Sequence, residues 1–371
     1  MISRERLLRL FAGERADRPA VKVWGLELNK PPRHPAYREI HELGIRHSDL
    51  VHSVSPTFNP YAGHLAKSHI RQYTRKTGMP DWEDVLTEYD TGRGKLCGVF
   101  RESTTGGHGY QMEYPVKEAQ DLEMILAMPY EQNNFDASAF YKSEKLLGDR
   151  GITTIYFDHA GMALWNLMGS ETLAYLLHEC PDLLEHATSI FSNRILAFAK
   201  EAYKKDLCAH IGWVGPELFI PPLTSMDTFE RLVFSFDKKL INLAHENSSS
   251  CWVHCHGKMR AVLPRMADMG VDVLNPIEPP PMGDLTIEEA FMLNKDRMTL
   301  EGNIETHDLM TLPTRELTEK IEHVLKTGHR MGRLILSPSS GYDEEPVPSK
   351  LLIENLRAFI LKGVEIAKDL D

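Results

Sequence analysis

The second half of the sequence repeats one pattern, a short apolar run followed by a longer amphipathic run. The apolar runs predict strands at 153–157, 207–213, 251–256, 271–274, 298–300 and 334–336. The amphipathic runs predict helices at 181–205, 228–246, 258–269, 287–294, 314–327 and 350–368, with Pro264 kinking the third. Because strands and helices alternate, the pattern favours a parallel sheet covered by helices.

The first half adds two apolar runs, at 20–24 and 49–52, and two helical segments, at 3–12 and 37–43. The stretch 60–115 is instead rich in Gly, Thr and charge and alternates in polarity, which predicts an antiparallel insertion. We therefore expect a single domain over 1–371, an α/β (β/α)8 TIM barrel with an N-terminal helix and an inserted β-rich excursion at about 60–115. An open doubly wound sheet is the alternative, although no G-x-G-x-x-G or Walker A run follows a predicted strand.

The composition of the chain excludes some classes of binding partner and location. The chain has 42 Lys and Arg against 53 Asp and Glu, a formal charge of −11, and no basic run, which disfavours nucleic acid. No stretch reaches the ~18 apolar residues of a membrane span, and the evenly charged N-terminus does not resemble a signal peptide. The chain has five cysteines, Cys97, Cys180, Cys208, Cys251 and Cys255. Because the number is small and odd, a disulfide framework is not expected, and we expect a cytoplasmic protein.

In a barrel of this kind, the chemistry lies just past the carboxyl ends of the strands. Acids, imidazoles and glycines follow the predicted strands here repeatedly. The runs are 157–161 (FDHAG), 213–217 (WVGPE), 253–258 (VHCHGK), 275–278 (NPIE), 300–303 (LEGN) and 337–343 (SPSSGYD). Their convergence predicts one site at one end of the barrel.

Among these residues, His254 and His256 carry the most specific signal. Residues two apart on a strand project to the same side, so both imidazoles would face the barrel interior while Cys255 faces the helices as a core thiol. Two neutral imidazoles suit zinc, which usually takes three protein ligands at a catalytic site. We expect Glu217 as the third ligand, with Glu278 and Glu301 as the other candidates. The alternative is a hydrogen-bonded pair of pocket histidines without a metal.

Other strand-end residues remain open between a functional and a structural role. Asp158 and His159 would act as acid and base, or only one of them would face the pocket. Glu278 and Glu301 would bind substrate or cap helices. Trp24, Trp213 and Tyr342 would line a cavity for an aromatic ligand or belong to the core. We expect the substrate to contact Trp24, Trp213, Asn275, Glu278 and Asn303.

Several segments resemble the uroporphyrinogen decarboxylase superfamily, which holds that decarboxylase and zinc methyltransferases that work with corrinoid proteins. The resemblance covers nearly the whole chain. It rests on 35–40 (PAYREI), 161–181 with its GSE turn at 169–171, 228–257 ending in HCHG, 270–278 (GVDVLNPIE), 301–304 (EGNI) and 336–341 (LSPSSG). It implies a (β/α)8 barrel with a pocket at its carboxyl end.

Two departures separate the branches of that family. The decarboxylase carries an Arg-rich Met-Arg-Gln-Ala-Gly-Arg run that grips its carboxylates, whereas residues 24–30 read WGLELNK. The thiol-methylating branch holds zinc with a His-x-Cys pair and a later Cys, whereas this chain has His256 and Ser340 at those places. A zinc ion bound by imidazoles and a carboxylate is a stronger Lewis acid, better suited to an oxygen than to a thiolate.

The resemblance therefore implies a zinc-dependent, corrinoid-dependent methyltransferase that demethylates a small O-methyl donor, such as a methoxylated aromatic. Zinc would be held by His254, His256 and Glu217, with Asp158, His159 or Tyr342 as proton donor. The partner would be a corrinoid (cobalamin) protein. The alternatives are a metal-free decarboxylase-like lyase acting on a smaller acid, and a non-catalytic barrel that binds a tetrapyrrole or a methyl donor.

Overall fold

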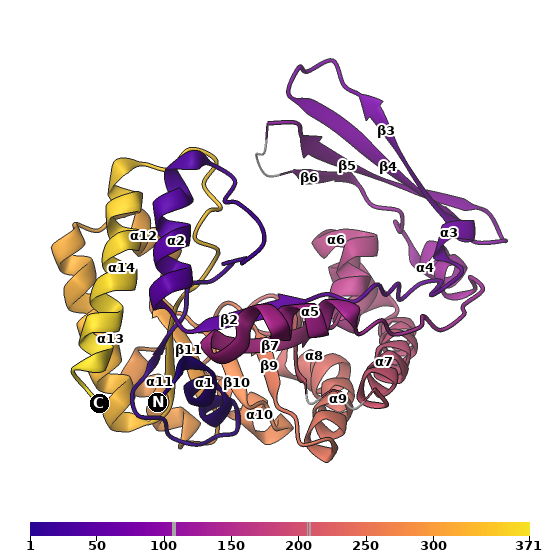
Figure 1. The fold of residues 1–371 in the computed structure, drawn as a ribbon. Coiled ribbons are helices and arrows are strands. Elements are labelled where there is room, and N and C mark those ends of the chain that lie inside the picture. The colour runs from indigo at the N-terminus through magenta and orange to yellow at the C-terminus, as the bar shows by residue number, and fades with distance from the viewer. Residues whose placement is uncertain (106–108, 206, 208) are drawn as a thin grey trace.

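The centre of the protein is a parallel sheet that curls into a barrel. A computed structural model describes residues 1–105, 109–205, 207 and 209–371 (Figure 1). The sheet has eight strands in the order β1-β12-β11-β10-β9-β8-β7-β2. Their bounds are β1 (Ala20–Val21), β2 (Leu50–Val54), β7 (Gly151–Tyr156), β8 (His210–Val214), β9 (Cys251–His254), β10 (Val273–Ile277), β11 (Thr299–Ile304) and β12 (Leu334–Pro338).

The two edge strands of this sheet meet at Asp49. Its backbone N–H donates to the carbonyl of Val21 at 2.7 Å, and its carboxylate accepts from the N–H of Val21 at 2.9 Å. These contacts join the end of β1 to the start of β2. The barrel-like α/β fold predicted from the sequence is therefore confirmed.

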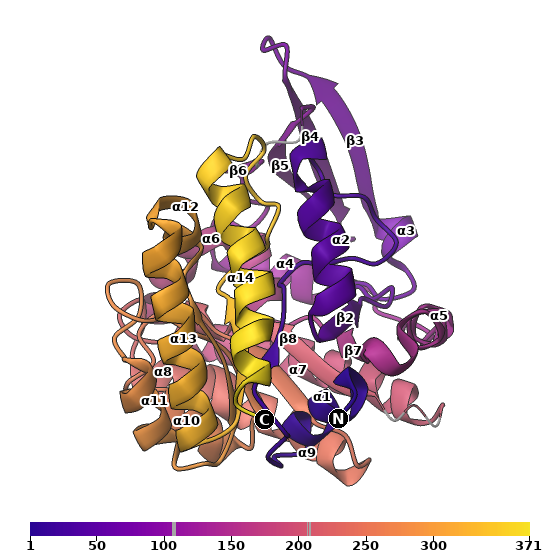
Figure 2. The same cartoon turned by 60° about the vertical axis from the view of Figure 1, so that its left-hand side comes forward.

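Helices surround the sheet (Figures 1 and 2), and the longer ones bury an apolar face in the core that they share with the strands. The bounds are α1 (Ser3–Phe11), α2 (Arg38–His47), α3 (Ala66–His69), α4 (Ala119–Leu126), α5 (Ser138–Leu147), α6 (Ala160–Glu179), α7 (Pro181–Tyr203), α8 (Met226–Phe229), α9 (Ser235–Glu246), α10 (Leu263–Met269), α11 (Ile287–Asn294), α12 (Thr306–Thr311), α13 (Thr314–Met331) and α14 (Lys350–Lys368). Short 3-10 segments lie at Pro35–Tyr37, Gly148–Arg150 and Pro216–Phe219, and a π-helical segment at Glu230–Phe234.

Two predicted helices differ in detail. The expected kink at Pro264 is wrong, because α10 begins at Leu263 and the proline stands in the first turn, where its missing N–H costs nothing. The segment predicted at 228–246 is split into α8, the π-helical turn and α9. Helix α6 was not predicted, since its backbone is non-helical at Gly169 (φ 67°) and no single apolar stripe continues across that break.

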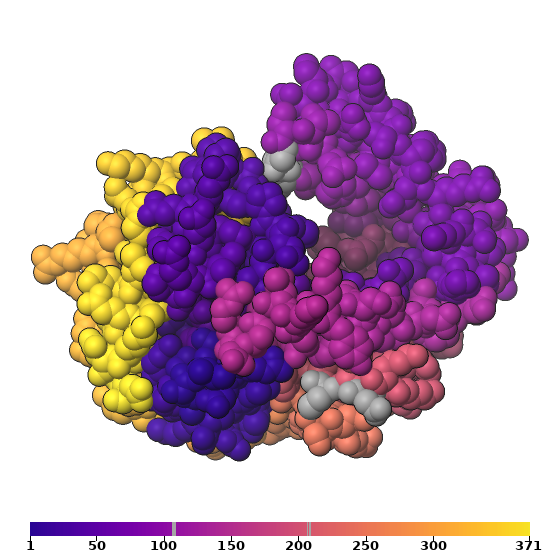
Figure 3. Space-filling model, in the orientation of Figure 1, coloured from indigo at the N-terminus to yellow at the C-terminus, as the bar shows by residue number. Residues whose placement is uncertain are grey.

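The predicted excursion is an antiparallel sheet of β3 (Ile70–Lys76), β4 (Trp82–Asp90), β5 (Lys95–Ser103) and β6 (Tyr110–Glu113), paired in that order. It rises from the barrel on the side of the carboxyl strand ends (Figure 1), and a hollow separates it from the segment around α2 (Figure 3). Its base rests on α6, where the ring of Tyr114 packs edge-on against Trp165 and the N–H of Val116 donates to the carbonyl of Leu167 at 3.0 Å.

In the described part of the chain, no helix combines the length and the apolar character that crossing a membrane requires. Cys97, Cys180, Cys251 and Cys255 are free thiols, and Cys208 lies outside the described residues. Cys255 is fully buried, as expected of a core thiol, and burial raises the pKa of its thiol well above the usual value.

Candidate active site

Two neighbouring cavities open at the carboxyl ends of the strands, and together they form what we call the mouth. One of about 210 Å3 is bordered by Lys22, His52 and Ser53, and one of about 310 Å3 is bordered by Tyr342. Trp24 and its neighbours Gly25 and Glu27 line both cavities. The mouth lies where a barrel of this kind carries its chemistry.

A buried ion pair lies beneath the mouth. Lys22, directly after β1, donates to Glu301 of β11 at 2.7 Å, and both side chains are buried. The indole N–H of Trp252 and the amide of Asn275 also donate to this carboxylate, at 3.1 and 3.0 Å. Glu301, a candidate metal ligand from the sequence, is the hydrogen-bonded counterion of Lys22. Burial lowers the pKa of Lys22, and the Glu301 carboxylate opposes that shift.

The His254 ring is linked to this pair through Asn275 and to the mouth through Trp24. Its Nδ1 lies 2.5 Å from the Oδ1 of Asn275, whose amide nitrogen already donates to Glu301, so Nδ1 must carry the proton. The ring stacks on Trp24 with centroids 5.1 Å apart. Burial, followed by the charge of His256, lowers the pKa of His254 to about 3. His254 is therefore a neutral imidazole that presents an unprotonated Nε2.

His256 lies beside it, with ring centroids 4.4 Å apart, so the structure brings the predicted pair together. Nδ1 of His256 lies 2.8 Å from one oxygen of Glu278, and the N–H of Gly257 donates to the other at 2.8 Å. Burial alone would lower the pKa of His256, but the carboxylate of Glu278 outweighs it and the pKa is raised. Glu278 thus orients an imidazole, and its expected contact with substrate stays a prediction.

Glu305, the residue directly after β11, is a buried acid that sequence reasoning missed. One carboxylate oxygen accepts from Ser339 at 3.2 Å, and the other is buried with no partner among the described residues. Burial, and then the charge of Glu278, raise the pKa of Glu305 to about 7. A carboxyl group with such a pKa can hold a proton near neutral pH and release it to a neighbouring oxygen.

The residues proposed for zinc meet part of its requirements. Asn275 and Glu278 engage the Nδ1 atoms of His254 and His256, as outer partners do around metal-bound histidines, and no described residue forms a hydrogen bond with either Nε2. Glu217, the predicted third zinc ligand, interacts electrostatically with His256. Its carboxylate accepts a hydrogen bond from the N–H of Gly215 at 3.2 Å. No group of three His, Cys, Asp or Glu in the described ranges is arranged to hold a metal. The imidazole pair fits zinc, and the third ligand is not in place.

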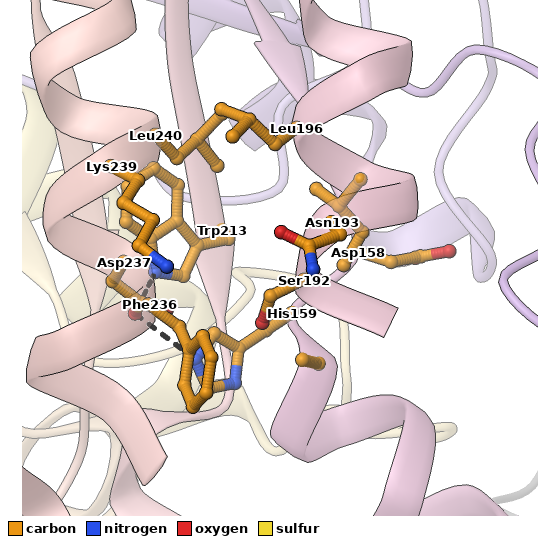
Figure 4. Close-up of a pocket in the computed structure, with 12 residues that line it drawn as sticks. Asp158, His159, Ser192, Asn193, Leu196, Trp213, Phe236, Asp237, Lys239 and Leu240 are labelled. Atoms are coloured by element: carbon orange, nitrogen blue, oxygen red, sulfur yellow. Dashed lines mark hydrogen bonds and ion pairs between the residues drawn. The ribbon is translucent and has the colours of Figure 1, made fainter. Parts of the chain in front are cut away.

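A second histidine centre lies between the barrel and its helices, around a small cavity formed with α7 and α9 (Figure 4). The buried His159 places its Nε2 3.0 Å from Asp237 of α9, and the indole N–H of Trp213 donates to the same carboxylate at 3.1 Å. Nδ1 of His159 is buried and has no partner in the described chain. Trp213, expected at the mouth, instead packs on the helix side of β8.

The remaining predicted residues lie in different surroundings. Asp158 points away from the His159–Asp237 pair (Figure 4), and burial raises the pKa of its carboxyl. Tyr342 lies at the mouth with its hydroxyl 2.8 Å from Nδ1 of His41, and burial raises the pKa of that hydroxyl. The side-chain amide of Asn303 donates to the carbonyl of Ile277 on β10 at 2.7 Å, so it forms a hydrogen bond between neighbouring strands.

Chemically, the aromatic wall of the mouth at Trp24 stacks on the neutral imidazole of His254, which lies in ring contact with His256. Glu305, whose pKa is about 7, interacts with Glu278, the partner of His256. Carboxylates outnumber cations at its rim: Glu27, Asp343 and Glu344 line the larger cavity with Lys30 and Arg33, and Lys30 is paired with Glu27 at 2.8 Å. Glu305 and Asp237 were missed. Glu305 was detectable as the acid that ends the EGNIE run, whereas nothing in the sequence links Asp237 to His159.

Comparisons with known proteins agree with this architecture. A sequence profile described as uroporphyrinogen decarboxylase (URO-D) matches residues 162–362, more than half of the chain. A solved structure, a methyltransferase from Methanosarcina mazei, superposes with a TM-score of 0.60 at 16% identity, covering 98% of this chain and 99% of that one. At this identity the likeness extends to the fold alone. Among curated protein sequences there is no significant match.

Proposed function

Because the chain belongs to the uroporphyrinogen decarboxylase family, we propose that it is a methyltransferase that takes a methyl group from an O-methyl donor, such as a methoxylated aromatic, and transfers it to the corrinoid of a partner protein. One observation carries the proposal: two adjacent imidazoles, His254 and His256, have their Nδ1 atoms fixed by Asn275 and Glu278 and their Nε2 atoms without a hydrogen bond to a described residue, and His254 stacks on Trp24 of the mouth. The fold of the Methanosarcina mazei methyltransferase supports it.

The charge of the mouth argues against a polycarboxylate substrate. Lys22 is buried against Glu301, and Lys30 is paired with Glu27, so neither is free for a substrate carboxylate. A polyanion would meet Glu27, Asp343 and Glu344 at the rim, where like charges disfavour binding. A neutral aromatic ether meets no such cost and can pack on Trp24.

The chain's own residues would perform the following roles. His254 and His256 would hold a zinc ion, with Glu217 as third ligand after its carboxylate leaves the N–H of Gly215. When bound, zinc would supply Lewis-acid polarisation of the ether oxygen. Glu305 would hold a proton and give it to the oxygen as the methyl–oxygen bond breaks, so that the donor leaves as an alcohol or phenol. Asp158, His159 and Tyr342 are the other candidate proton donors.

The test combines metal analysis with an assay of methyl transfer. Purified protein, as isolated and after chelation, is incubated with a reduced corrinoid protein and a series of methoxyarenes, and the absorbance of methyl-cobalt is followed. We expect stoichiometric zinc and donor-dependent methyl-cobalt, both lost in His254→Ala. His178→Ala is the matched control, because His178 is an exposed histidine on α6.

Three results would contradict the proposal. The first is no methyl-cobalt with any donor together with no stoichiometric metal. The second is release of carbon dioxide from a small acid that survives both chelation and His254→Ala, which identifies a decarboxylase-like lyase. The third is ligand binding without turnover, which identifies a binding barrel.

A further inference from the structure

A cavity of about 200 Å3 lies at the end of the barrel opposite the mouth. Pro19 and Leu334, which line it, stand at the starts of β1 and β12, so the cavity opens where parallel strands begin. Helix α1 and both chain termini lie at this end of the molecule (Figures 1 and 2). The cavity is therefore separate from the candidate active site.

The polar side chains that line this cavity are all basic. They are Arg15, Arg18, Arg333 and His329, and the lining contains no carboxylate. In a chain with a formal charge of −11, three guanidinium groups and an imidazole around one hollow are not expected from composition. The local charge points to an anionic ligand.

Some N–H donors of these basic side chains have no hydrogen-bond acceptor among the described residues. Arg333 donates to Asp296 at 2.8 Å, but its Nε is buried with no hydrogen-bond partner in the described chain. Arg18 donates to the carbonyl of Pro19 at 2.9 Å and lies 3.5 Å from Asp49. Arg15 is exposed and forms no ion pair with a described residue. Arg18 and Arg333 are themselves more than nine-tenths buried, which makes their unused donors costly.

We propose that this cavity binds a phosphate group, either free or carried by a small molecule. Guanidinium forks match the oxygens of phosphate in pairs, and they remain charged at every physiological pH. A water molecule occupies about 30 Å3 of liquid, so 200 Å3 holds a phosphate with a small substituent. Burial lowers the pKa of Arg18, although the charges of Asp49, Asp17 and Asp371 oppose that shift.

The experiment titrates the full-length protein with inorganic phosphate, and separately with glycerol 3-phosphate, by calorimetry at constant ionic strength. We expect saturable binding and a melting temperature that rises with ligand concentration. Tighter binding of the ester assigns the site to a phosphorylated small molecule, and tighter binding of inorganic phosphate assigns it to the free ion. Either result supports the proposal.

Variants locate the site. Arg15→Gln should raise the Kd by roughly tenfold, since a charge-assisted hydrogen bond is worth that much or more, and His329→Gln should weaken binding less. The matched control is Arg330→Gln, because Arg330 is exposed beside His329 on α13 but does not line the cavity. Both test residues are exposed, so neither substitution threatens the fold. The proposal is overturned if phosphate fails to saturate the protein, or if Arg15→Gln binds as the wild type does.

Discussion

At the scale of single residues, the environment of a carboxyl group decides whether it acts as an anion or as an acid. Glu301 and Glu305 follow each other closely on the chain and are both buried, but Glu301 accepts from the Lys22 ammonium group at 2.7 Å and from two further side-chain donors. Glu305 has one hydroxyl donor and an acidic neighbour. Burial and the charge of Glu278 therefore raise the pKa of Glu305 to about 7.

Replacing Glu305 with Gln tests this assignment. The folded-state pKa of Glu305 lies above its unfolded value of 4.5, so ionisation weakens the fold as pH rises through about 7. Glu305→Gln should therefore gain stability relative to the wild type as pH rises from about 4.5 to 7, with no further gain above that, and lose methyl transfer by roughly 100-fold. Denaturant unfolding and the pH–rate profile measure the two effects. A variant with full activity and an unchanged profile would show that Glu305 is not the acid.

For His210 we predict the opposite pH dependence of the free energy of unfolding, a loss of stability as pH falls. This buried imidazole accepts the N–H of Ser250 at 3.3 Å, and burial lowers its pKa to about 4. The neutral form is favoured in the fold, so its stabilising effect is complete above pH 6.5 and is lost as pH falls towards 4. Between pH 7 and 5, wild-type unfolding should lose about 2 kcal/mol more than His210→Gln does. Equal losses in urea titrations would contradict the buried neutral state.

At the scale of elements, close contacts between helices and strands fix the wall of the barrel. Gly328 of α13 faces β12 so closely that a Cβ built on it would lie 2.3 Å from Leu334. Gly328→Ala should cost about 1–3 kcal/mol, because the helix must move away from the strand. Gly78→Ala is the control, since nothing lies within 4 Å of its Cβ position. Melting curves compare the two, and equal stabilities would show that α13 adjusts freely.

Periodicity could predict these elements because it records burial directly. The alternation of short apolar and longer amphipathic runs places all eight strands, and the H-x-H spacing brings His254 and His256 to ring contact. Trp213 shows what periodicity does not predict. Which face of β8 it takes depends on strand register, and its partner Asp237 comes from a helix that the sequence does not align with it. The pKa of Glu305 likewise depends on its burial and on Glu278, which directly follows β10.

At the scale of the whole molecule, Asp49 connects the N-terminal helix to the closure of the barrel. Its buried carboxylate accepts from Arg6 at 2.7 Å and from the N–H of Val21, while its own N–H donates to Val21. Asp49→Ala should cost about 3–5 kcal/mol, since it leaves Arg6 with less compensation in the interior. Glu39→Ala, which breaks an exposed pair with Arg357, should cost less than about 1 kcal/mol. Similar losses in chemical denaturation would refute the closure role.

The pairing of Lys22 with Glu301 has a consequence for how fast donors reach the mouth. Because the two charges cancel beneath the cavity, the long-range field at the entrance comes from the rim, where Glu27, Asp343 and Glu344 lie. Such a field repels anions in dilute salt and is screened within about 10 Å at 0.1 M ionic strength. Capture of anionic aromatics should therefore accelerate as salt is added, whereas capture of uncharged ones should not change. Salt sensitivity of the encounter rate thus distinguishes donors before any bond is broken.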